Sequence, residues 1–325
     1  MAVIFSTHPL HPDVTARLMA VGDYRVASAP TAAAFMAEGL DADVIIVRSN
    51  IPPEYFAAAP KLRAAVRHGA GLDMVPMQAA TDAGVLVANV PGANAGTVAE
   101  HAIFAAIALR RQFRAMDIAL RKRGWAAGRA HADIGRDLSG ATLGVLGMGN
   151  IGRALTRMAQ CGFGMQVISH TRRPEGLPDG VRAVSLDALV SQADVLVLCC
   201  PLTDATRGVI SAARIAMMPP GAVLINVSRG PVVDTAALTQ ALSERRILGA
   251  ALDVFDVQPL PDDSPLFGLD NVLLTPHWAG VTQDSMLRVG DQVAGEVTAV
   301  LDNRLPANFC NPEVIQAYRA RFPAP

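Results

Sequence analysis

A glycine-rich hexapeptide is the feature of this sequence that most directly suggests chemistry. Its residues are Gly147, Met148, Gly149, Asn150, Ile151 and Gly152. An apolar run, 142–146, precedes it and a helical stretch follows. In this context the first glycine permits a tight turn, the second lets a pyrophosphate approach the backbone, and the third allows close helix–strand packing. The helix N-terminus supplies amide donors and partial positive charge. A plain glycine-rich turn is the alternative, but the flanking elements favour a dinucleotide site.

The end of the next predicted strand bears on which cofactor would bind. An acidic residue there accepts a hydrogen bond from a ribose 2′-hydroxyl, whereas arginine accommodates a 2′-phosphate. Here the chain reads His170, Thr171, Arg172 and Arg173, without a carboxylate. Two guanidiniums can make charge-assisted bonds to a phosphate dianion. The sequence therefore predicts NADP(H) in preference to NAD(H), with a solvated basic turn as the alternative.

Two other side chains, Arg229 and His277, each follow the end of a predicted strand, where open α/β sheets present ligands. The planar fork of Arg229 can hold a carboxylate and polarise a neighbouring carbonyl group. His277 has a pKa range suited to giving a proton to a carbonyl oxygen as a hydride arrives. The alternatives are a surface arginine at a helix entry and a structural histidine.

These residues require a scaffold, and the apolar runs of the chain supply one. Short runs alternate with helical stretches, which predicts parallel sheets of α/β type. The expected strands are 3–5, 44–47, 64–66 and 85–88 in the first part, and 143–146, 166–169, 195–199, 223–227, 250–254 and 272–274 in the second. At 325 residues the chain exceeds the usual size of a single core. We therefore expect a substrate domain, 1–97 plus 285–325, and a dinucleotide-binding domain, 98–284.

One helix, predicted over 98–109, is apolar on nearly every side. Such a helix must be buried, either between domains or between subunits. Thr97 and Glu100 form a capping-box signature at its expected start.

Several ordered segments together resemble one known family. They are 147–152, 200–203, 226–230, 253–260 and 275–280, with 69–73 and 94–100 earlier in the chain. They resemble the D-isomer-specific 2-hydroxyacid dehydrogenases over essentially the whole chain. The resemblance implies a flavodoxin-like substrate domain and a Rossmann nucleotide-binding domain. It also implies hydride transfer between a nicotinamide cofactor and a small D-2-hydroxy acid/2-oxo acid pair, such as glyoxylate or hydroxypyruvate.

The same resemblance assigns roles to individual residues. The backbone amides of Ala70 and Gly71 would bind the substrate carboxylate. Asp253 would hold the carboxamide of the nicotinamide, and Pro201 would belong to the cofactor site. Arg48 follows the strand 44–47 and could contact a distal group of the substrate, although a surface ion pair is an equally good interpretation.

One position departs from the family pattern. Gln258 stands where the family carries a glutamate paired with the histidine. A glutamine can still orient the imidazole of His277 by a hydrogen bond, but it lacks the negative charge that stabilises imidazolium. Formate dehydrogenases of the same superfamily also carry glutamine here, so a formate dehydrogenase-like hydride transfer is the second enzymatic hypothesis. A nucleotide-sensing, corepressor-like binding protein is the hypothesis from another class.

Composition argues against several other functions. The formal net charge of −1 provides no field to attract nucleic acid or an anionic membrane. The four cysteines have neither CxxC spacing nor the density of a disulfide scaffold, which is typical of a reducing cytoplasm. The N-terminus has no signal or membrane segment. We expect a cytoplasmic enzyme of small molecules with no metal site and, by analogy with the family, a homodimer.

Overall fold

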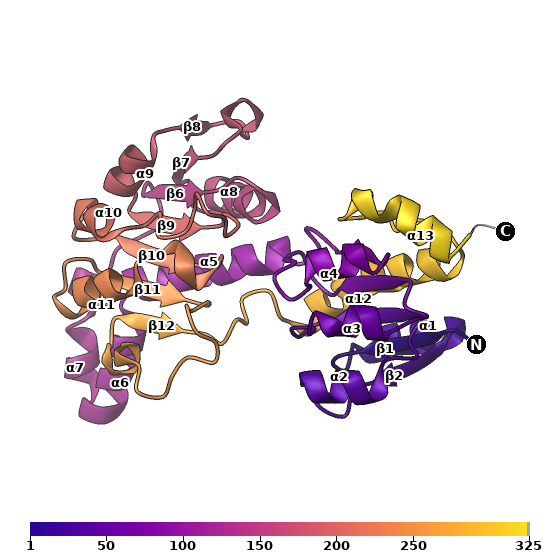
Figure 1. Cartoon of the computed structure of the whole chain (residues 1–325). Coiled ribbons are helices and arrows are strands. Elements are labelled where there is room, and N and C mark those ends of the chain that lie inside the picture. Colours follow the sequence, from indigo (N-terminus) through magenta and orange to yellow (C-terminus); the bar gives the residue numbers. More distant parts are fainter. Residues whose placement is uncertain (324–325) are drawn as a thin grey trace. The chain divides into compact units, whose positions relative to one another are not determined.

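The computed structural model describes residues 1–323, which divide into two compact units. Unit 1 consists of Met1–Asn94 and the chain from Val281 onward, and unit 2 is Ala95–Gly280. Each unit contains one parallel sheet (Figure 1). The sequence placed the two domain boundaries after residues 97 and 284, whereas the units divide after residues 94 and 280.

Unit 1 is built on a five-stranded sheet of order β2-β1-β3-β4-β5. This is the flavodoxin-like order. Its strands are β1 (Val3–Ser6), β2 (Asp23–Val26), β3 (Val44–Val47), β4 (Ala64–Arg67) and β5 (Leu86–Ala88). Its helices are α1 (Pro12–Val21), α2 (Ala32–Glu38), α3 (Glu54–Ala58), α4 (Met77–Asp82), α12 (Gln283–Leu301) and α13 (Ile315–Arg321), with a 3-10 turn at Pro312–Val314.

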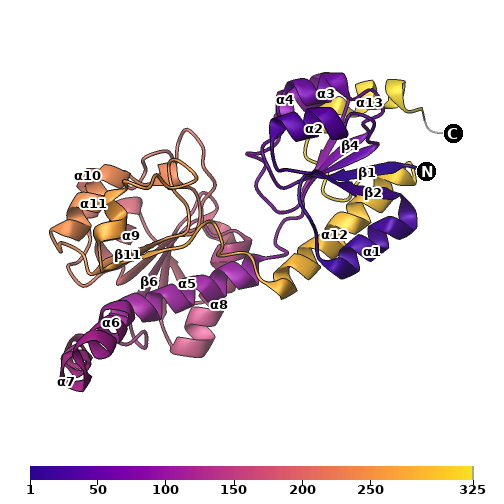
Figure 2. The ribbon, with the colours of Figure 1, turned by 90° about the horizontal axis from the view of Figure 1, so that it is seen from below.

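Both faces of this sheet are buried. Successive side chains of a strand point to opposite faces. Thus Ile4 and Val44 pack against α1 and α12, whereas Phe5 and Ile45 pack against α2, α3 and α4. The two helical layers can be followed on either side of the sheet in Figure 2. Double burial explains why a strand such as β3 is apolar throughout and could be recognised in the sequence.

Unit 2 is built on a seven-stranded sheet of order β12-β11-β10-β9-β6-β7-β8. Its strands are β6 (Thr142–Leu146), β7 (Gln166–His170), β8 (Val181–Ala183), β9 (Val195–Leu198), β10 (Val223–Asn226), β11 (Gly249–Leu252) and β12 (Val272–Leu274). Its helices are α5 (Ala95–Arg110), α6 (Phe113–Arg123), α7 (Trp125–Arg129), α8 (Asn150–Phe163), α9 (Leu186–Gln192), α10 (Ala212–Met217) and α11 (Thr235–Ser243). Short 3-10 turns lie at Ala132–Ile134, Pro174–Gly176, Gly230–Val232 and Pro265–Gly268.

The second sheet is also covered on both faces. On β9, Val195 and Val197 pack toward α5 and α8, whereas Leu196 and Leu198 pack toward α9, α10 and α11. All the pairings between neighbouring strands in this sheet are parallel. The prediction of two doubly wound parallel-sheet domains is therefore confirmed.

The apolar helix predicted over 98–109 corresponds to α5, with two differences. It begins at Ala95, so Thr97 lies inside the first turn, and the expected capping box was wrong. Its burial within this chain is also incomplete, because Phe104 is 57% exposed and Ile107 is 38% exposed. Unit 2 by itself therefore leaves part of one helix face uncovered.

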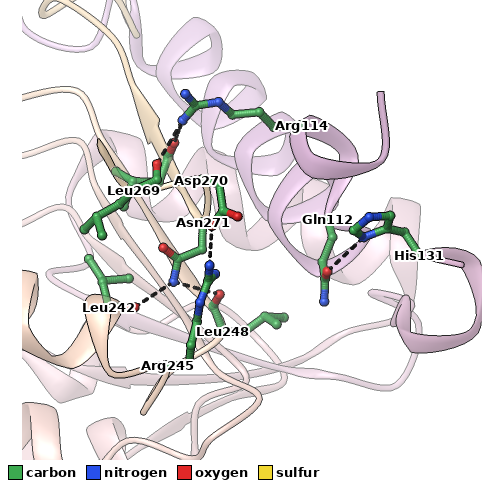
Figure 3. A network of polar contacts seen from close by, with 10 residues as sticks. Gln112, Arg114, His131, Leu242, Arg245, Leu248, Leu269, Asp270 and Asn271 are labelled. Carbon is green, nitrogen blue, oxygen red and sulfur yellow. Dashed lines mark hydrogen bonds and ion pairs between the residues drawn. The ribbon is translucent and has the colours of Figure 1, made fainter. Parts of the chain in front are cut away.

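The junction between α5 and α6 is held by contacts with His131 and with the amino end of β12 (Figure 3). Gln112 adopts a left-handed backbone conformation, with φ of 49°, and its side chain contacts His131 at 3.4 Å. Arg114 then donates hydrogen bonds to the carbonyls of Leu269 and Val272, at 3.1 and 2.6 Å. The bonds of Arg114 hold the first turn of α6 against the start of β12.

Within residues 1–323, no helix combines the length and apolar character needed to span a membrane. The same residues contain no group of three histidine, cysteine or acidic side chains arranged to hold a metal ion.

Candidate active site

The glycine-rich turn between β6 and α8 has the geometry of a phosphate-binding loop. Gly147 has φ of 95°, and a Cβ atom there would lie 2.8 Å from the backbone nitrogen of Cys200. A Cβ at Gly152 would lie 2.4 Å from the carbonyl oxygen of Gly147. At Gly149, in contrast, nothing lies within 4 Å of such an atom. The turn is therefore closed on its protein side and open at Gly149, where α8 begins and where a pyrophosphate would need to approach.

The loop after β7 carries the residues predicted to select the cofactor. Thr171 is half-buried and its hydroxyl accepts a hydrogen bond from the amide of Arg173 at 3.5 Å. Arg172 and Arg173 are exposed, and within the described chain neither guanidinium forms an ion pair. No carboxylate stands at positions 171–173, and the first one after the strand is Glu175. The loop thus offers two cationic groups whose charge is not neutralised by a neighbour.

Pro201 lies in the loop after β9. Thr206 orders this loop, because its hydroxyl donates to the carbonyl of Pro201 at 2.7 Å and accepts from the amide of Thr203 at 2.7 Å. The preceding residue, Cys200, is the one that packs against Gly147. The structure therefore brings Pro201 to the same edge of the sheet as the glycine-rich turn.

Arg229 follows β10 and is held by a buried asparagine that the sequence analysis did not single out. Asn226 donates from its side chain to the carbonyl of Arg229 at 3.0 Å and accepts from the amide of Ser228 at 3.0 Å. Gly230 passes so close to the next loop that a Cβ atom would lie 2.0 Å from the carbonyl carbon of Phe255. The half-buried Arg229 side chain is thus presented by a tightly built turn.

Asp253 organises the turn that carries the histidine. One of its carboxylate oxygens, Oδ1, accepts three hydrogen bonds, from the hydroxyl of Thr275 at 2.6 Å and the amides of Trp278 at 2.7 Å and Ala279 at 3.0 Å. The amide of His277 donates to the carbonyl of Asp253 at 2.8 Å.

His277 has φ of 55°, a left-handed conformation that is uncommon for a non-glycine residue. Such backbone strain is often found at functional sites. Sequence reasoning gave Asp253 only a cofactor contact and missed this positioning role.

His277 and Gln258 contact each other. Nδ1 of the imidazole lies 3.2 Å from Oε1 of Gln258, while Nε2 of Gln258 is 3.4 Å from the carbonyl of Phe255. Both side chains are exposed. The side-chain oxygen of Gln258 therefore faces the imidazole of His277. In this position it can accept a hydrogen bond from Nδ1 and so orient one tautomer of the ring.

His101 on α5 is a further polar residue near this turn, and the sequence analysis did not select it. Its ring stacks edge-on against Trp278, with centroids 6.2 Å apart. Burial lowers the pKa of His101, while the negative charge of Asp253 acts in the opposite direction. The only sequence signal was a single histidine in an otherwise apolar helical stretch.

In unit 1, the loop after β4 presents Ala70 and Gly71. The carbonyl of Ala70 accepts from the side chain of Asn89 at 2.7 Å, and that of Gly71 accepts from Nε of Arg67 at 3.1 Å. In the described part of the chain, the amides of Ala70 and Gly71 donate no hydrogen bond. With their carbonyls fixed, these amides are free to bind an anion.

Arg48, at the end of β3, is half-buried, and its Nη1 donates to the carbonyl of Pro9 at 2.8 Å. Within residues 1–323 no carboxylate pairs with it, so the alternative interpretation as a surface ion pair is not found. Burial lowers the pKa of Arg48. Its positive charge also contributes, after burial, to the lowered pKa of His8 and of His68. Of these three side chains only Arg48 is cationic at neutral pH, because the lowered pKa values keep both imidazoles neutral.

Comparisons with known proteins agree with this geometry. Residues 103–279 match the NAD binding domain of the D-isomer specific 2-hydroxyacid dehydrogenases. The chain is 38% identical to a glyoxylate reductase from Korarchaeum cryptofilum, over 85% of this chain and 84% of that protein. It is 36% identical to a D-3-phosphoglycerate dehydrogenase from Methanocaldococcus jannaschii, over 96% of this chain but only 60% of that protein's length.

A solved structure supports the same relationship. The chain is similar to an NADPH-dependent glyoxylate/hydroxypyruvate reductase from Sinorhizobium meliloti, determined in complex with NADP and malonate. The TM-score is 0.84 and the sequence identity 30%, over 96% of this chain and 97% of that one.

Proposed function

The chain belongs to the D-isomer-specific 2-hydroxyacid dehydrogenase family, and from this we propose that it is an NADPH-dependent reductase of a small 2-oxo acid such as glyoxylate or hydroxypyruvate. The reverse reaction would oxidise the corresponding D-2-hydroxy acid. Both directions transfer a hydride to or from the carbon that carries the oxygen.

One observation carries the proposal. The glycine-rich turn, Arg229 and His277 follow β6, β10 and β12, which are parallel strands of a single sheet. The carboxyl ends of parallel strands meet at one edge, where ligands of open α/β sheets bind. The phosphate-binding turn, a carboxylate-binding group and a proton donor therefore share one edge of unit 2.

The roles of these residues follow from their chemistry. When bound, the nicotinamide cofactor supplies the hydride for reduction. Arg229 would bind the substrate carboxylate and polarise the carbonyl group. His277 would give a proton to the carbonyl oxygen, and would take it back during oxidation. Gln258 would hold the imidazole in place, and Asp253 would fix the turn around His277 in addition to its proposed contact with the nicotinamide carboxamide.

The preference for NADP(H) is supported by the loop after β7. Arg172 and Arg173 are exposed and unpaired within the described chain, and Thr171 occupies the position where a carboxylate would repel a 2′-phosphate. Such guanidiniums can bind a phosphate in bidentate fashion. Use of NAD(H) at lower efficiency is compatible with the same loop.

In unit 1, the amides of Ala70 and Gly71 would bind a carboxylate through hydrogen bonds that the fold itself leaves unused. Arg48 would contact a second polar or anionic group of the substrate. This role of Arg48 is supported by the lack of an ion-pair partner for its guanidinium among residues 1–323.

We also propose that the protein is a cytoplasmic homodimer. The uncovered face of α5 continues into a cavity of about 520 Å³ lined by Phe104, Leu120 and Trp125, among others. Trp125 is 77% exposed, and apolar surface of this kind is commonly covered by a partner. Sedimentation equilibrium would detect the dimer. The four cysteines are free, as is typical of a reducing compartment.

The decisive experiment follows the absorbance of NADPH and NADH with the purified protein and a panel of 2-oxo acids. We expect oxidation of NADPH with glyoxylate or hydroxypyruvate, and a lower kcat/KM with NADH. Formate with NADP⁺ or NAD⁺ tests the formate dehydrogenase-like hypothesis. Cofactor binding without turnover of any substrate would favour the corepressor-like alternative and would contradict the proposal.

A further inference from the structure

The connection between β7 and β8, residues 171–180, is fastened to helix α8 at two points. Arg153 donates through Nη2 to the carbonyl of Gly176. Gln160 donates through Nε2 to the carbonyl of Asp179 at 3.2 Å. Arg153 and Gln160 are seven residues apart, so both project from the same face of the helix. The connection can be followed from β7 to β8 beside α8 in Figure 1.

The hydrogen bond between Arg153 and Gly176 lies close to the residues proposed to select the cofactor, Thr171, Arg172 and Arg173. A 3-10 turn, Pro174–Gly176, directly follows Arg173, and the amide of Gly176 donates to the carbonyl of Arg173 at 3.3 Å. The amide of Arg173 in turn contacts the hydroxyl of Thr171 at 3.5 Å. A displacement of Gly176 would therefore be transmitted to the backbone of Arg173.

The position of Arg153 is itself informative. It stands at the fourth position of α8, near the positive end of the helix dipole, where a cation is electrostatically disfavoured. The same helix end is the proposed binding site of the pyrophosphate. The hydrogen bond from Arg153 to the loop explains why a cation stands at this unfavourable position.

We propose that Arg153 is a positioning residue for recognition of the cofactor's 2′-phosphate. By holding Gly176, it keeps the backbone of Arg173, and with it the flanking Arg172, in the place where the phosphate arrives. An exposed loop that is already ordered loses less conformational entropy when it binds a ligand. The inference rests on the proposed preference for NADPH, and it predicts that Arg153 affects this preference without contacting the reacting atoms.

The chain offers a matched control. Arg157 lies one turn further along α8, is exposed like Arg153, and forms no hydrogen bond or ion pair within the described residues. Arg153→Met and Arg157→Met remove the same charge from the same helix, but only the first removes the attachment. Arg153→Lys keeps the charge and a hydrogen-bond donor at the end of a long side chain.

The experiment compares kcat/KM for NADPH and NADH in the wild-type protein and the three variants, with thermal unfolding as a check of folding. For Arg153→Met we expect the NADPH:NADH ratio to fall about three- to tenfold, as for the loss of one exposed charge-assisted hydrogen bond, mainly through a higher KM for NADPH. Arg157→Met should retain the wild-type ratio, and Arg153→Lys should recover part of it.

Each other outcome has a definite meaning. An unchanged ratio in Arg153→Met, or an equal fall in Arg157→Met, would overturn the positioning role. An equal loss with NADPH and NADH in Arg153→Met would indicate general damage to the fold and would also overturn it. A wild-type protein that uses both cofactors equally would refute the proposed NADPH preference itself, and the positioning role with it.

Discussion

Nδ1 of His277 lies 3.2 Å from Oε1 of Gln258. The amide oxygen can accept a hydrogen bond from the ring and so favours the tautomer with the proton on Nδ1. In that tautomer Nε2 is left to exchange a proton with a substrate. Unlike the glutamate expected at this position, however, the amide carries no charge that would stabilise the protonated ring.

Gln258→Glu should therefore change the pH dependence of the reaction. A carboxylate beside the ring stabilises imidazolium, so His277 would remain protonated to higher pH. Reduction needs the protonated ring, and its kcat/KM should fall off at a pH higher by about one unit or more. The measurement is kcat/KM for the 2-oxo acid across pH, in both proteins. Because the two side chains are in contact, superimposable profiles would mean that another group donates the proton.

Arg229 and His277 should show different kinetic defects. Arg229→Ala removes the group proposed to bind the substrate carboxylate, so it should raise KM for the 2-oxo acid and lower turnover while cofactor affinity remains nearly intact. His277→Ala should chiefly lower kcat, by about 10²-fold or more, as expected for loss of a general acid. Steady-state kinetics and titration of the cofactor distinguish these effects. Wild-type turnover in either variant would exclude the role given to that residue.

The two sheets show which strands could be predicted from the sequence and why two strands could not. Strands buried on both faces, such as β3 and β9, are apolar runs and were predicted. The two strands that were missed, β2 and β8, each lie at an edge of their sheet and consist of Asp-Tyr-Arg-Val and Val-Arg-Ala. An edge strand is partly solvated, so it needs no continuous apolar run.

The candidate site, too, could be predicted from the sequence only in part. The order of motifs along the chain located Arg229 and His277 at strand ends, because a parallel sheet alternates strands and helices in a regular way. The three hydrogen bonds to Oδ1 of Asp253 and the left-handed backbone of His277 depend on coordinates that no spacing pattern encodes. The contact of His101 with Trp278 joins residues far apart in the sequence, so the pattern of α5 alone did not reveal it.

The cofactor preference should be reversible through the loop after β7. Thr171→Asp would introduce a carboxylate that repels a 2′-phosphate and accepts a hydrogen bond from a 2′-hydroxyl. Combined with neutral replacements of Arg172 and Arg173, it should make kcat/KM larger with NADH than with NADPH. The measurement compares both cofactors in the triple variant and in the wild-type protein. A variant that still prefers NADPH would mean that other residues select the phosphate.

Arg48 should discriminate between substrates by their distal group. Arg48→Met should raise KM about tenfold or more for 2-oxo acids that carry a second carboxylate or a phosphate, since a hydrogen bond to a charged partner contributes about 1.5–3 kcal/mol. Glyoxylate has no distal group and serves as the internal control, with KM expected to remain close to the wild-type value. An equal rise for glyoxylate would place Arg48 outside substrate selection.

His68 should make the stability of unit 1 depend on pH. The ring is buried directly after β4, and Nε2 has no hydrogen-bond partner among the described residues. Burial, followed by the charges of Arg48 and Arg67, lowers the pKa of His68 from its ordinary value of 6.5 to about 3. Below pH 6.5 the unfolded chain therefore binds a proton that the folded chain rejects, and stability falls as the pH decreases toward 3.

Over that range the contribution amounts to about 1.4 kcal/mol per pH unit for one proton. Between about pH 7.5 and about pH 5.5, urea unfolding should show the wild-type protein losing about 1.4 kcal/mol more than His68→Gln, which has no titrating ring. The comparison cancels the contributions of other titrating groups, because they are common to both proteins. Equal losses in the two proteins would show that His68 accepts a proton in the folded state or that the ring is not buried in solution.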